Sequence, residues 1–212
     1  MPSATLTINS RNYGAWSLRG WLMCRFAGLD FDVEEADAND PSQRDELLLM
    51  SPSFLVPCLT IDGLEIWDTL AIGEYLAERF PDVGLLPSDP ATRALCRSVS
   101  GEMHSGFAAL RREHPMDLGL RTSKPPSDTV AADVRRIVAL WRTLLDRFGG
   151  PFLAGEWSIA DAFYTPVATR FRSYGFDLSA HGDDGSAQAC ADALLSTPEY
   201  LQWEREALAE AR

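Results

Sequence analysis

The chain lacks any long apolar run and has little cysteine. No segment approaches the roughly 20 apolar residues that a membrane-spanning helix needs, and the first five residues lack the basic stretch and apolar core of a signal peptide. Cys24, Cys58, Cys96 and Cys190 are scattered without C-x-x-C or metal-ligand spacing. We therefore expect no membrane partner, no disulfide framework, no metal site, and a reducing cytoplasmic location.

Positive charge is also in short supply. The 212 residues include 19 Lys and Arg against 31 Asp and Glu, a formal net charge of −12. Nucleic-acid binding neutralises phosphates with clustered Lys and Arg, so this balance argues against a nucleic-acid partner. Hydrophobic residues make up 46% of the chain, enough for a sizeable core, and the length suits two domains. The composition fits a protein that acts on small molecules.

Residues 1–79 alternate between strand and helix patterns. The segment 5–8 alternates polar and apolar residues, as a strand does, and apolar residues between 18 and 26 recur at helical spacing. The segment 31–34 has the pattern of a second strand. Asp40-Pro41 then offers an N-cap followed by proline at the first helical position, which predicts a second helix.

A hairpin and a last helix complete this half. Two apolar runs, 56–61 and 64–67, are joined by Asp62-Gly63, a strong hairpin signal. Apolar residues from 70 to 76 predict the helix that follows. The order βαβ-α-ββα predicts an α/β domain with a mixed sheet, in which the βαβ unit pairs in parallel and the hairpin adds antiparallel strands.

Beyond residue 79 the strand patterns disappear. A stretch rich in proline and glycine, 80–89, is the best domain boundary. We expect a first domain at 1–79, a linker at 80–89 and an all-α helical bundle at 90–212. Ser158 and Asp161 match a capping box at the start of one helix. The helical patterns cover residues 90–113, 129–148, 159–174, 185–196 and 198–211.

Two short motifs in the first half could contact a ligand. Pro57 precedes a predicted strand, where proline is tolerated and could be cis, leaving the backbone of Val56 to pair with an extended peptide. An ordinary turn proline is the alternative. Asp68 and Thr69 open the next helix. Asp is a good N-cap, and a helix N-terminus with a hydroxyl can also hold a carboxylate, so both roles can hold together.

In combination these features resemble the glutathione transferase family. The βαβ unit, Val56-Pro57, Asp68-Thr69, the linker and the capping box occur in the family's order, and the resemblance covers nearly the whole chain. The segments 16–22 and 102–107 look like a bacterial branch of the serine- and cysteine-type transferases, related to zeta or maleylacetoacetate-isomerase-like members. The resemblance implies a thioredoxin-like first half and a homodimer.

The same resemblance implies glutathione as co-substrate, lying extended along the first half. Val56, before a cis Pro57, would pair with its cysteinyl backbone, and Asp68 and Thr69 would hold its γ-glutamyl group. The thiol would attack a small hydrophobic electrophile, by conjugation or by isomerisation through a transient adduct. The resemblance places this second substrate in a pocket that includes Trp16, His104 and Phe107.

One departure from the family pattern concerns activation of the thiol. Where the branch places serine or cysteine, this chain has Gly14 and Ala15, which offer no side-chain donor. Thiolate is the nucleophile, so a donor must favour it over the thiol. The remaining candidates for this catalytic role are Asn12, Tyr13 and Ser17.

A second departure concerns a missing positive charge. Phe54 and Leu55 stand where many relatives carry a basic residue that contacts the glycyl carboxylate, and Arg11 or the partner subunit could supply it. The missing donors also leave a rival function open, a non-enzymatic glutathione- or ligand-binding module. A regulatory protein that has lost glutathione is opposed by the retained motifs, and a thiol-disulfide oxidoreductase by Cys24, which falls well inside the first helix.

Overall fold

The computed structural model describes residues 4–36 and 55–210. In these residues the strands β1 (Ala4–Ile8), β2 (Asp32–Glu35), β3 (Cys58–Ile61) and β4 (Leu64–Trp67) form one sheet in the order β2-β1-β3-β4. β1 pairs in parallel with β2, while β1–β3 and β3–β4 are antiparallel. The predicted mixed sheet is confirmed. The helix predicted after Asp40-Pro41 lies outside the described residues.

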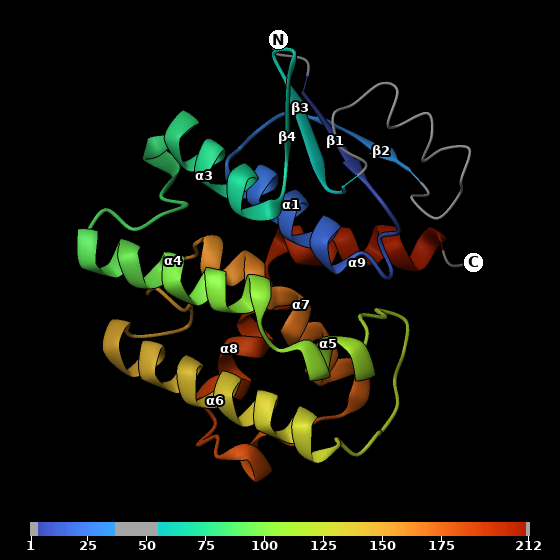
Figure 1. The fold of residues 1–212 in the computed structure, drawn as a ribbon, viewed down its shortest axis with the longest axis vertical. Helices are drawn as coiled ribbons and strands as arrows, with labels where there is room; N and C mark the ends of the chain where they lie inside the picture. The colour runs from blue at the N-terminus through green and yellow to red at the C-terminus, as the bar shows by residue number, and fades with distance from the viewer. Residues whose placement is uncertain (1–3, 37–54, 211–212) are drawn as a thin grey trace.

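One layer of helices lies between the sheet and the helical half. Helices α1 (Ala15–Phe26) and α3 (Thr69–Arg79) cover one face of the sheet, and the helical half lies beyond them (Figure 1). A short 3-10 turn, η1 (Pro81–Val83), begins the connection. The predicted arrangement of an α/β half followed by an all-helical half is confirmed.

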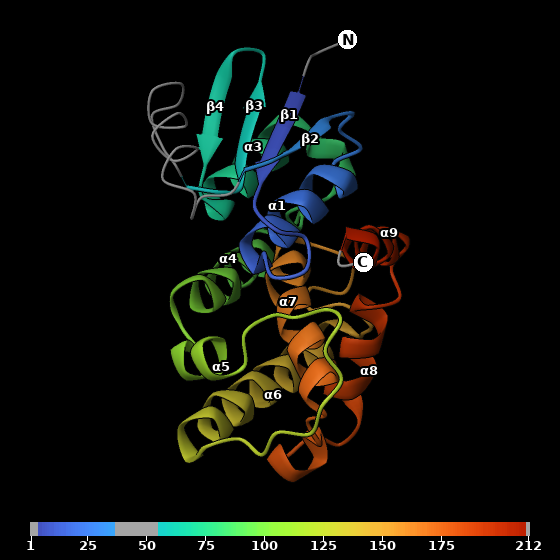
Figure 2. The ribbon, with the colours of Figure 1, turned by 90° about the vertical axis from the view of Figure 1, so that its right-hand side faces the viewer.

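The helical half is built around α7 (Ile159–Tyr174), which runs through its centre and is buried along almost its whole length (Figure 2). None of the helices in the described residues is both long and apolar enough to cross a membrane. Around α7 lie α4 (Pro90–Ser105), α5 (Ala108–Glu113), α6 (Asp128–Phe148), η2 (Leu178–His181), α8 (Ser186–Leu194) and α9 (Pro198–Glu210).

Helix α1 is enclosed by both halves. Its residues from Ser17 to Cys24 are buried without a break, because the sheet covers one side while α7 and α9 pack on the others. The rings of Trp21 and Trp203, from α1 and α9, are 5.4 Å apart. A Cβ at Gly20 would lie 2.8 Å from Cγ of Pro57, so glycine is what allows α1 to approach the start of β3 so closely.

The single helix expected over 90–113 is broken in the structure. α4 ends at Ser105, Gly106 is extended, and Phe107 adopts a left-handed conformation with φ 55° before α5 begins. The break is held from both sides. Arg111 Nη1 donates to the carbonyls of His104 and Gly106 at 3.2 and 3.3 Å, and Asp133 accepts the amide of Leu110 at 3.0 Å. Side chains distant in sequence therefore override the local helical pattern.

The capping box predicted at the start of α7 is present and fully buried. The carboxylate of Asp161 accepts the amide of Ser158 at 2.8 Å and the amide of Leu153 at 3.0 Å, as well as the Ser158 hydroxyl at 2.9 Å. Burial raises the pKa of Asp161 to about 6 against the opposing effect of these donors. One carboxylate thus satisfies the backbone of the loop before the central helix.

We expect Asp161→Ala to destabilise the fold strongly. The substitution leaves the buried amides of Leu153 and Ser158 without acceptors, and each unsatisfied buried group costs about 1–3 kcal/mol. The free energy of unfolding in urea at pH 7 should fall by roughly 2–4 kcal/mol. Ser127→Ala is the control, because it removes an exposed N-cap from α6 and should cost about 1 kcal/mol. Equal losses in the two variants would contradict the role given to Asp161.

Candidate functional site

A cavity of about 580 Å³ lies where the start of α1 meets the helical half. The first half contributes the residues from Tyr13 to Trp16 together with Val56, so the predicted strand start and the predicted donor region share one cavity. The helical half closes it from α5 and α7. Its described lining residues are Asn9, Tyr13, Gly14, Ala15, Trp16, Arg19, Val56, Ala108, Arg111, Arg112, Pro115, Met116 and Arg170.

The backbone at the start of α1 leaves no room for a side chain at Gly14. A Cβ there would lie 2.3 Å from both Asn9 Oδ1 and the carbonyl of Ser10. The amide of Gly14 donates to that same carbonyl at 2.8 Å, which fixes the close approach. The absence of a serine at this position is therefore built into the turn. Ala15, the next residue, lines the cavity.

The three predicted donors are in different surroundings. Ser17 is fully buried, and its hydroxyl donates to Asn9 Oδ1 at 2.6 Å and accepts the Asn9 amide at 3.2 Å. Asn12 is also buried, and its Oδ1 accepts the amides of Leu118 and Gly119 at 2.9 and 3.2 Å. Tyr13 lines the cavity and is 63% exposed. Tyr13 is thus the candidate whose side chain reaches open space.

Val56 lines the cavity, and the Val56–Pro57 peptide bond is cis, as the family resemblance implied. At the next predicted site, Asp68 caps α3 by accepting the amide of Leu70 at 2.8 Å. Its backbone is left-handed, with φ 73°. The Thr69 hydroxyl is buried and has no hydrogen-bond partner among the described residues. The start of α3 therefore combines a carboxylate with an unused hydroxyl.

The residues predicted for the second-substrate pocket do not all reach the cavity. Trp16 lines it, whereas His104 and Phe107 are not among its described lining residues. His104 instead connects two predicted sites: its ring meets that of Trp16 edge-on at 5.0 Å, and its Nε2 is 3.3 Å from a carboxylate oxygen of Asp68. Phe107 is buried against Tyr164, with ring centroids 6.4 Å apart.

Sequence reasoning missed the arginines of this cavity. Arg19, Arg111 and Arg170 line it, and no motif in the sequence pointed to any of them. Arg19 is 2% exposed, and its guanidinium lies 4.2 Å from the ring centroid of Trp16 and 5.0 Å from that of Phe163. The available signal was its spacing, since Arg19 lies three residues before Leu22 and seven before Phe26 and so falls on the apolar face of the helix.

Burial lowers the pKa of Arg19 well below its ordinary value, and the nearby charges of Arg170 and Arg111 lower it further. Burial also lowers the pKa of Arg170, to about 10. The nearby charges of Tyr164 and Asp68 oppose the lowering of the Arg19 pKa without reversing it. The cavity is therefore a cationic region in an acidic protein.

Arg11, the residue considered for the missing positive charge, is already neutralised. Its guanidinium pairs with Glu35, with Glu206 at 3.3 Å and with Glu210 at 2.5 Å. Its carbonyl also accepts Nε1 of Trp203 at 3.1 Å. Arg11 thus connects the loop between β1 and α1 to α9. Phe54 lies outside the described residues, and Leu55 beside it is exposed.

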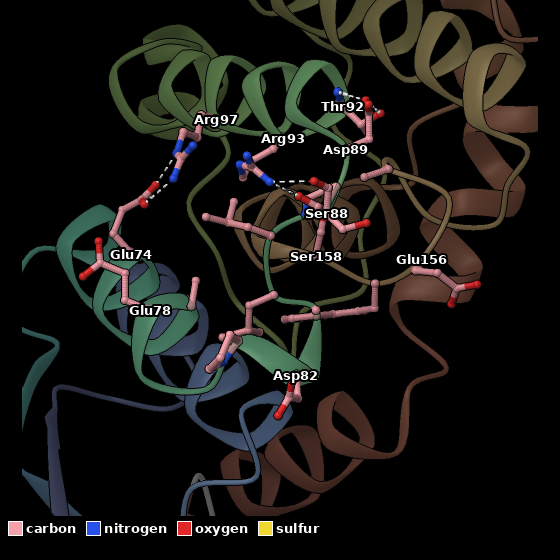
Figure 3. Close-up of a pocket in the computed structure, with 18 of the residues that line it drawn as sticks. Glu74, Glu78, Asp82, Ser88, Asp89, Thr92, Arg93, Arg97, Glu156 and Ser158 are labelled. Atoms are coloured by element: carbon pink, nitrogen blue, oxygen red, sulfur yellow. Dashed lines mark hydrogen bonds and ion pairs between the residues drawn. The ribbon is translucent and has the colours of Figure 1, made fainter.

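A second cavity, of about 720 Å³, lies at the connection between the halves (Figure 3). Several of its charged groups are engaged locally. Arg97 forms two 2.8 Å hydrogen bonds to Glu74, and Arg93 donates to the carbonyls of Pro87 and Ser88. None of the predicted site residues is among its described lining. The Arg97–Glu74 pair joins α3 to α4, which indicates a structural role for the residues around this cavity.

Among the described residues, no cluster of His, Cys, Asp or Glu could hold a metal ion.

Comparison with known proteins identifies the family. Residues 13–79 match the family model for the glutathione S-transferase N-terminal domain, and residues 102–200 match the one for the C-terminal domain. A probable maleylacetoacetate isomerase from Caenorhabditis elegans is 29% identical over 174 residues, covering 81% of this chain and 80% of the relative. Probable maleylacetoacetate isomerase 1 from Drosophila melanogaster is 30% identical over 173 residues, covering 79% and 68%.

The fold is shared with solved structures. A glutathione transferase homologue from Burkholderia, crystallised with bound glutathione, superimposes with a TM-score of 0.75 and covers 98% of this chain and 99% of its own. Sequence identity to that structure is 21%, so the likeness shows the fold.

We expect Asn12→Ala and Ser17→Ala to lower stability, and Tyr13→Phe to leave it unchanged. The first two remove buried hydrogen bonds, worth about 1–3 kcal/mol where a buried partner is left unsatisfied. The third changes an exposed side chain, for which shifts stay within about 0.5 kcal/mol. Urea denaturation of the three variants is the measurement. Wild-type stability in Asn12→Ala and Ser17→Ala would show that these side chains are not needed for the turn.

Proposed function

Because the chain belongs to the glutathione S-transferase family, we propose that it binds glutathione and uses the thiol on a small hydrophobic electrophile. The reaction is either conjugation or isomerisation through a transient adduct. Relatives named as maleylacetoacetate isomerases favour the second route. We also propose a cytoplasmic homodimer. The scattered spacing of the four cysteines, all of them buried, is consistent with a reducing compartment.

The observation that carries this proposal is the cavity itself. One space of about 580 Å³ connects the start of α1 with Val56. Glutathione pairing with the backbone of Val56 would have its thiol near Tyr13 and Ala15. The N-terminus of α1 lies at this region. The positive end of the helix dipole favours a negative charge there. A thiolate is the charge that such an arrangement stabilises.

The γ-glutamyl end of glutathione requires partners for one carboxylate and one amine. We assign the amine to Asp68 and the carboxylate to the hydroxyl of Thr69, which has no partner among the described residues, and to the amides at the start of α3. The Nε2 of His104, at 3.3 Å from Oδ2 of Asp68, would orient the carboxylate of Asp68.

A binding module without catalysis is the second candidate. The observation that favours it is the turn at Gly14, where a serine side chain has no room. Without a strong donor the bound thiol would stay largely protonated at neutral pH, since an unperturbed thiol has a pKa of about 8.5. The two candidates differ in the ionisation of bound glutathione, which is measurable.

We expect Asp68→Ala to weaken glutathione binding more than folding. Loss of a charged hydrogen-bonded contact costs about 1.5–3 kcal/mol, whereas loss of an N-cap costs about 1 kcal/mol. Isothermal titration with reduced glutathione and thermal denaturation of the same samples provide the two values. Asp89→Ala is the control, because Asp89 caps α4 through the amide of Thr92 at 2.7 Å and lines the other cavity, at the connection between the halves. Normal binding in an Asp68→Ala protein that melts early would reduce Asp68 to a cap.

We expect Tyr13→Phe to raise the pKa of the bound thiol by about one unit, which corresponds to about 1.4 kcal/mol. The measurement is the pH profile of thiolate absorbance in the glutathione complex. Asn12→Ala and Ser17→Ala should leave the profile unchanged, because both side chains are engaged in the turn. If Tyr13→Phe also leaves it unchanged, backbone amides hold the thiolate. A parent profile identical to that of free glutathione would establish the binding module.

A further inference from the structure

The space that a side chain at residue 14 would fill is taken by the carboxamide of Asn9. Asn9 directly follows β1, and a Cβ at Gly14 would lie 2.3 Å from its Oδ1. The side chain of Asn9 therefore packs against the glycine. A polar group from the end of the first strand thus stands at the N-terminus of α1, where the helix itself offers no side chain.

Two hydrogen bonds fix which end of this carboxamide faces the helix. The amide N–H of Asn9 donates to Oγ of Ser17 at 3.2 Å, and the Ser17 hydroxyl donates to Oδ1 of Asn9 at 2.6 Å. Ser17 is fully buried in α1, so the pairing anchors the end of β1 to the helix. Because Oδ1 is engaged as an acceptor, Nδ2 is the end of the carboxamide that remains.

Nδ2 of Asn9 is an unused donor beside the cavity. It makes no hydrogen bond to any described residue, and it is absent from the buried polar atoms that lack a partner, so it is open to solvent. Asn9 lines the cavity together with Gly14 and Ala15. A primary amide carries two N–H donors. The cavity therefore has a neutral side-chain donor in addition to Tyr13.

We propose that Nδ2 of Asn9 donates a hydrogen bond to the sulfur of bound glutathione and stabilises its thiolate form. This inference rests on the proposed function, because it takes the cavity to be the glutathione site. Asn9 supplies a second donor beside Tyr13, from the space that a side chain at residue 14 would occupy. The thiol proton leaves to solvent, because a neutral carboxamide donates a hydrogen bond but does not take up a proton.

The surroundings of Asn9 strengthen its carboxamide as a donor to an anion. The hydrogen bond that Oδ1 accepts from Ser17 polarises the amide, since linked hydrogen bonds reinforce one another. The N-terminus of α1 lies at the same place, and its dipole favours negative charge. A hydrogen bond to a charged group is stronger than one between neutral groups. Asn9 therefore stabilises the thiolate more than the protonated thiol.

The position of the carboxamide does not depend on Ser17 alone. Its packing against Gly14 remains when the Ser17 hydroxyl is removed, and a bound thiolate then selects the Nδ2 end of the amide. The unchanged pH profile expected for Ser17→Ala is therefore compatible with this role of Asn9.

The test is the pH profile of thiolate absorbance in complexes saturated with glutathione. Asn9→Leu replaces the carboxamide with an apolar side chain of similar size. It should raise the pKa of the bound thiol by about one to two units, the shift that follows the loss of a hydrogen bond to a charged group. Ser10→Ala is the matched control, because Ser10 is in the same loop and accepts the amide of Tyr13 at 3.3 Å but is absent from the described lining of the cavity. It should leave the pKa unchanged.

Affinity for S-methylglutathione distinguishes a donor to the sulfur from a residue that only supports the turn. The methylated sulfur cannot ionise, so Asn9→Leu should change this affinity by less than about twofold. Affinity for glutathione, measured above the thiol pKa of the free tripeptide, should fall by about tenfold or more, since one pKa unit is a tenfold factor. Equal losses of both affinities would assign Asn9 a structural role and overturn the proposal.

The Tyr13→Phe background separates Asn9 from the backbone amides at the start of α1. In that background Asn9→Leu should raise the pKa of the bound thiol again, whereas amides acting alone would leave it unchanged.

Asn9→Asp decides the question if Asn9→Leu does not fold. The aspartate keeps the shape of the side chain and an acceptor for the Ser17 hydroxyl, but it has an oxygen in place of Nδ2. It should raise the pKa of the bound thiol by at least about one unit, because the donor is lost and a like charge opposes ionisation. An unchanged pKa in Asn9→Asp would show that Nδ2 does not face the sulfur.

Failure of this inference and failure of the proposed function give different results. A parent protein that binds neither glutathione nor S-methylglutathione in isothermal titration contradicts both. A parent that binds glutathione, with the same thiol pKa as its folded Asn9 variants, overturns the role of Asn9 and leaves glutathione binding in place.

Discussion

The enclosure of helix α1 on every side is the constraint on which the rest of the structure depends. The helix lies between the sheet, α7 and α9, and its residues 17–24 are buried without a break. Gly20 permits the close approach to Pro57, which brings Val56 beside the start of the helix. Arg19 is the charged residue in this buried stretch, and it lines the cavity between the halves. Helix α1 thus contributes both to the core of the fold and to the lining of the candidate site.

Local patterns were sufficient to predict most of the fold. Alternation and the Asp62-Gly63 turn predicted the mixed sheet, and the helical patterns that begin at residues 90 and 198 match the observed starts of α4 and α9, Pro90 and Pro198. The break between α4 and α5 was missed, because it depends on Asp133 and on the return of Arg111 to the carbonyls before it. The residues that make such contacts can be distant in sequence and come together only in the tertiary structure.

The site was less predictable than the fold, for the same reason. Val56, Tyr13 and Trp16 could be placed near the cavity because they lie close to recognisable motifs. Asn12 and Ser17 were chosen for their chemistry, but their hydrogen-bond partners, Leu118 and Asn9, could not be read from the sequence. The arginines come from three helices, and nothing in the spacing of residues 19, 111 and 170 announces that they converge. The acidic composition of the chain as a whole gave no indication of a cavity lined by arginines.

The crowding at Gly14 also limits how the protein could change by mutation. Any larger residue there would collide with Asn9 and with the carbonyl of Ser10, so a serine could occupy that position only if the turn moved and the Asn9–Ser17 pairing were broken at the same time. Ala15, by contrast, already faces the cavity, and a codon change to serine would place a hydroxyl there without a comparable rearrangement. A serine hydroxyl in the cavity is therefore one substitution away at residue 15, while residue 14 requires several coordinated changes.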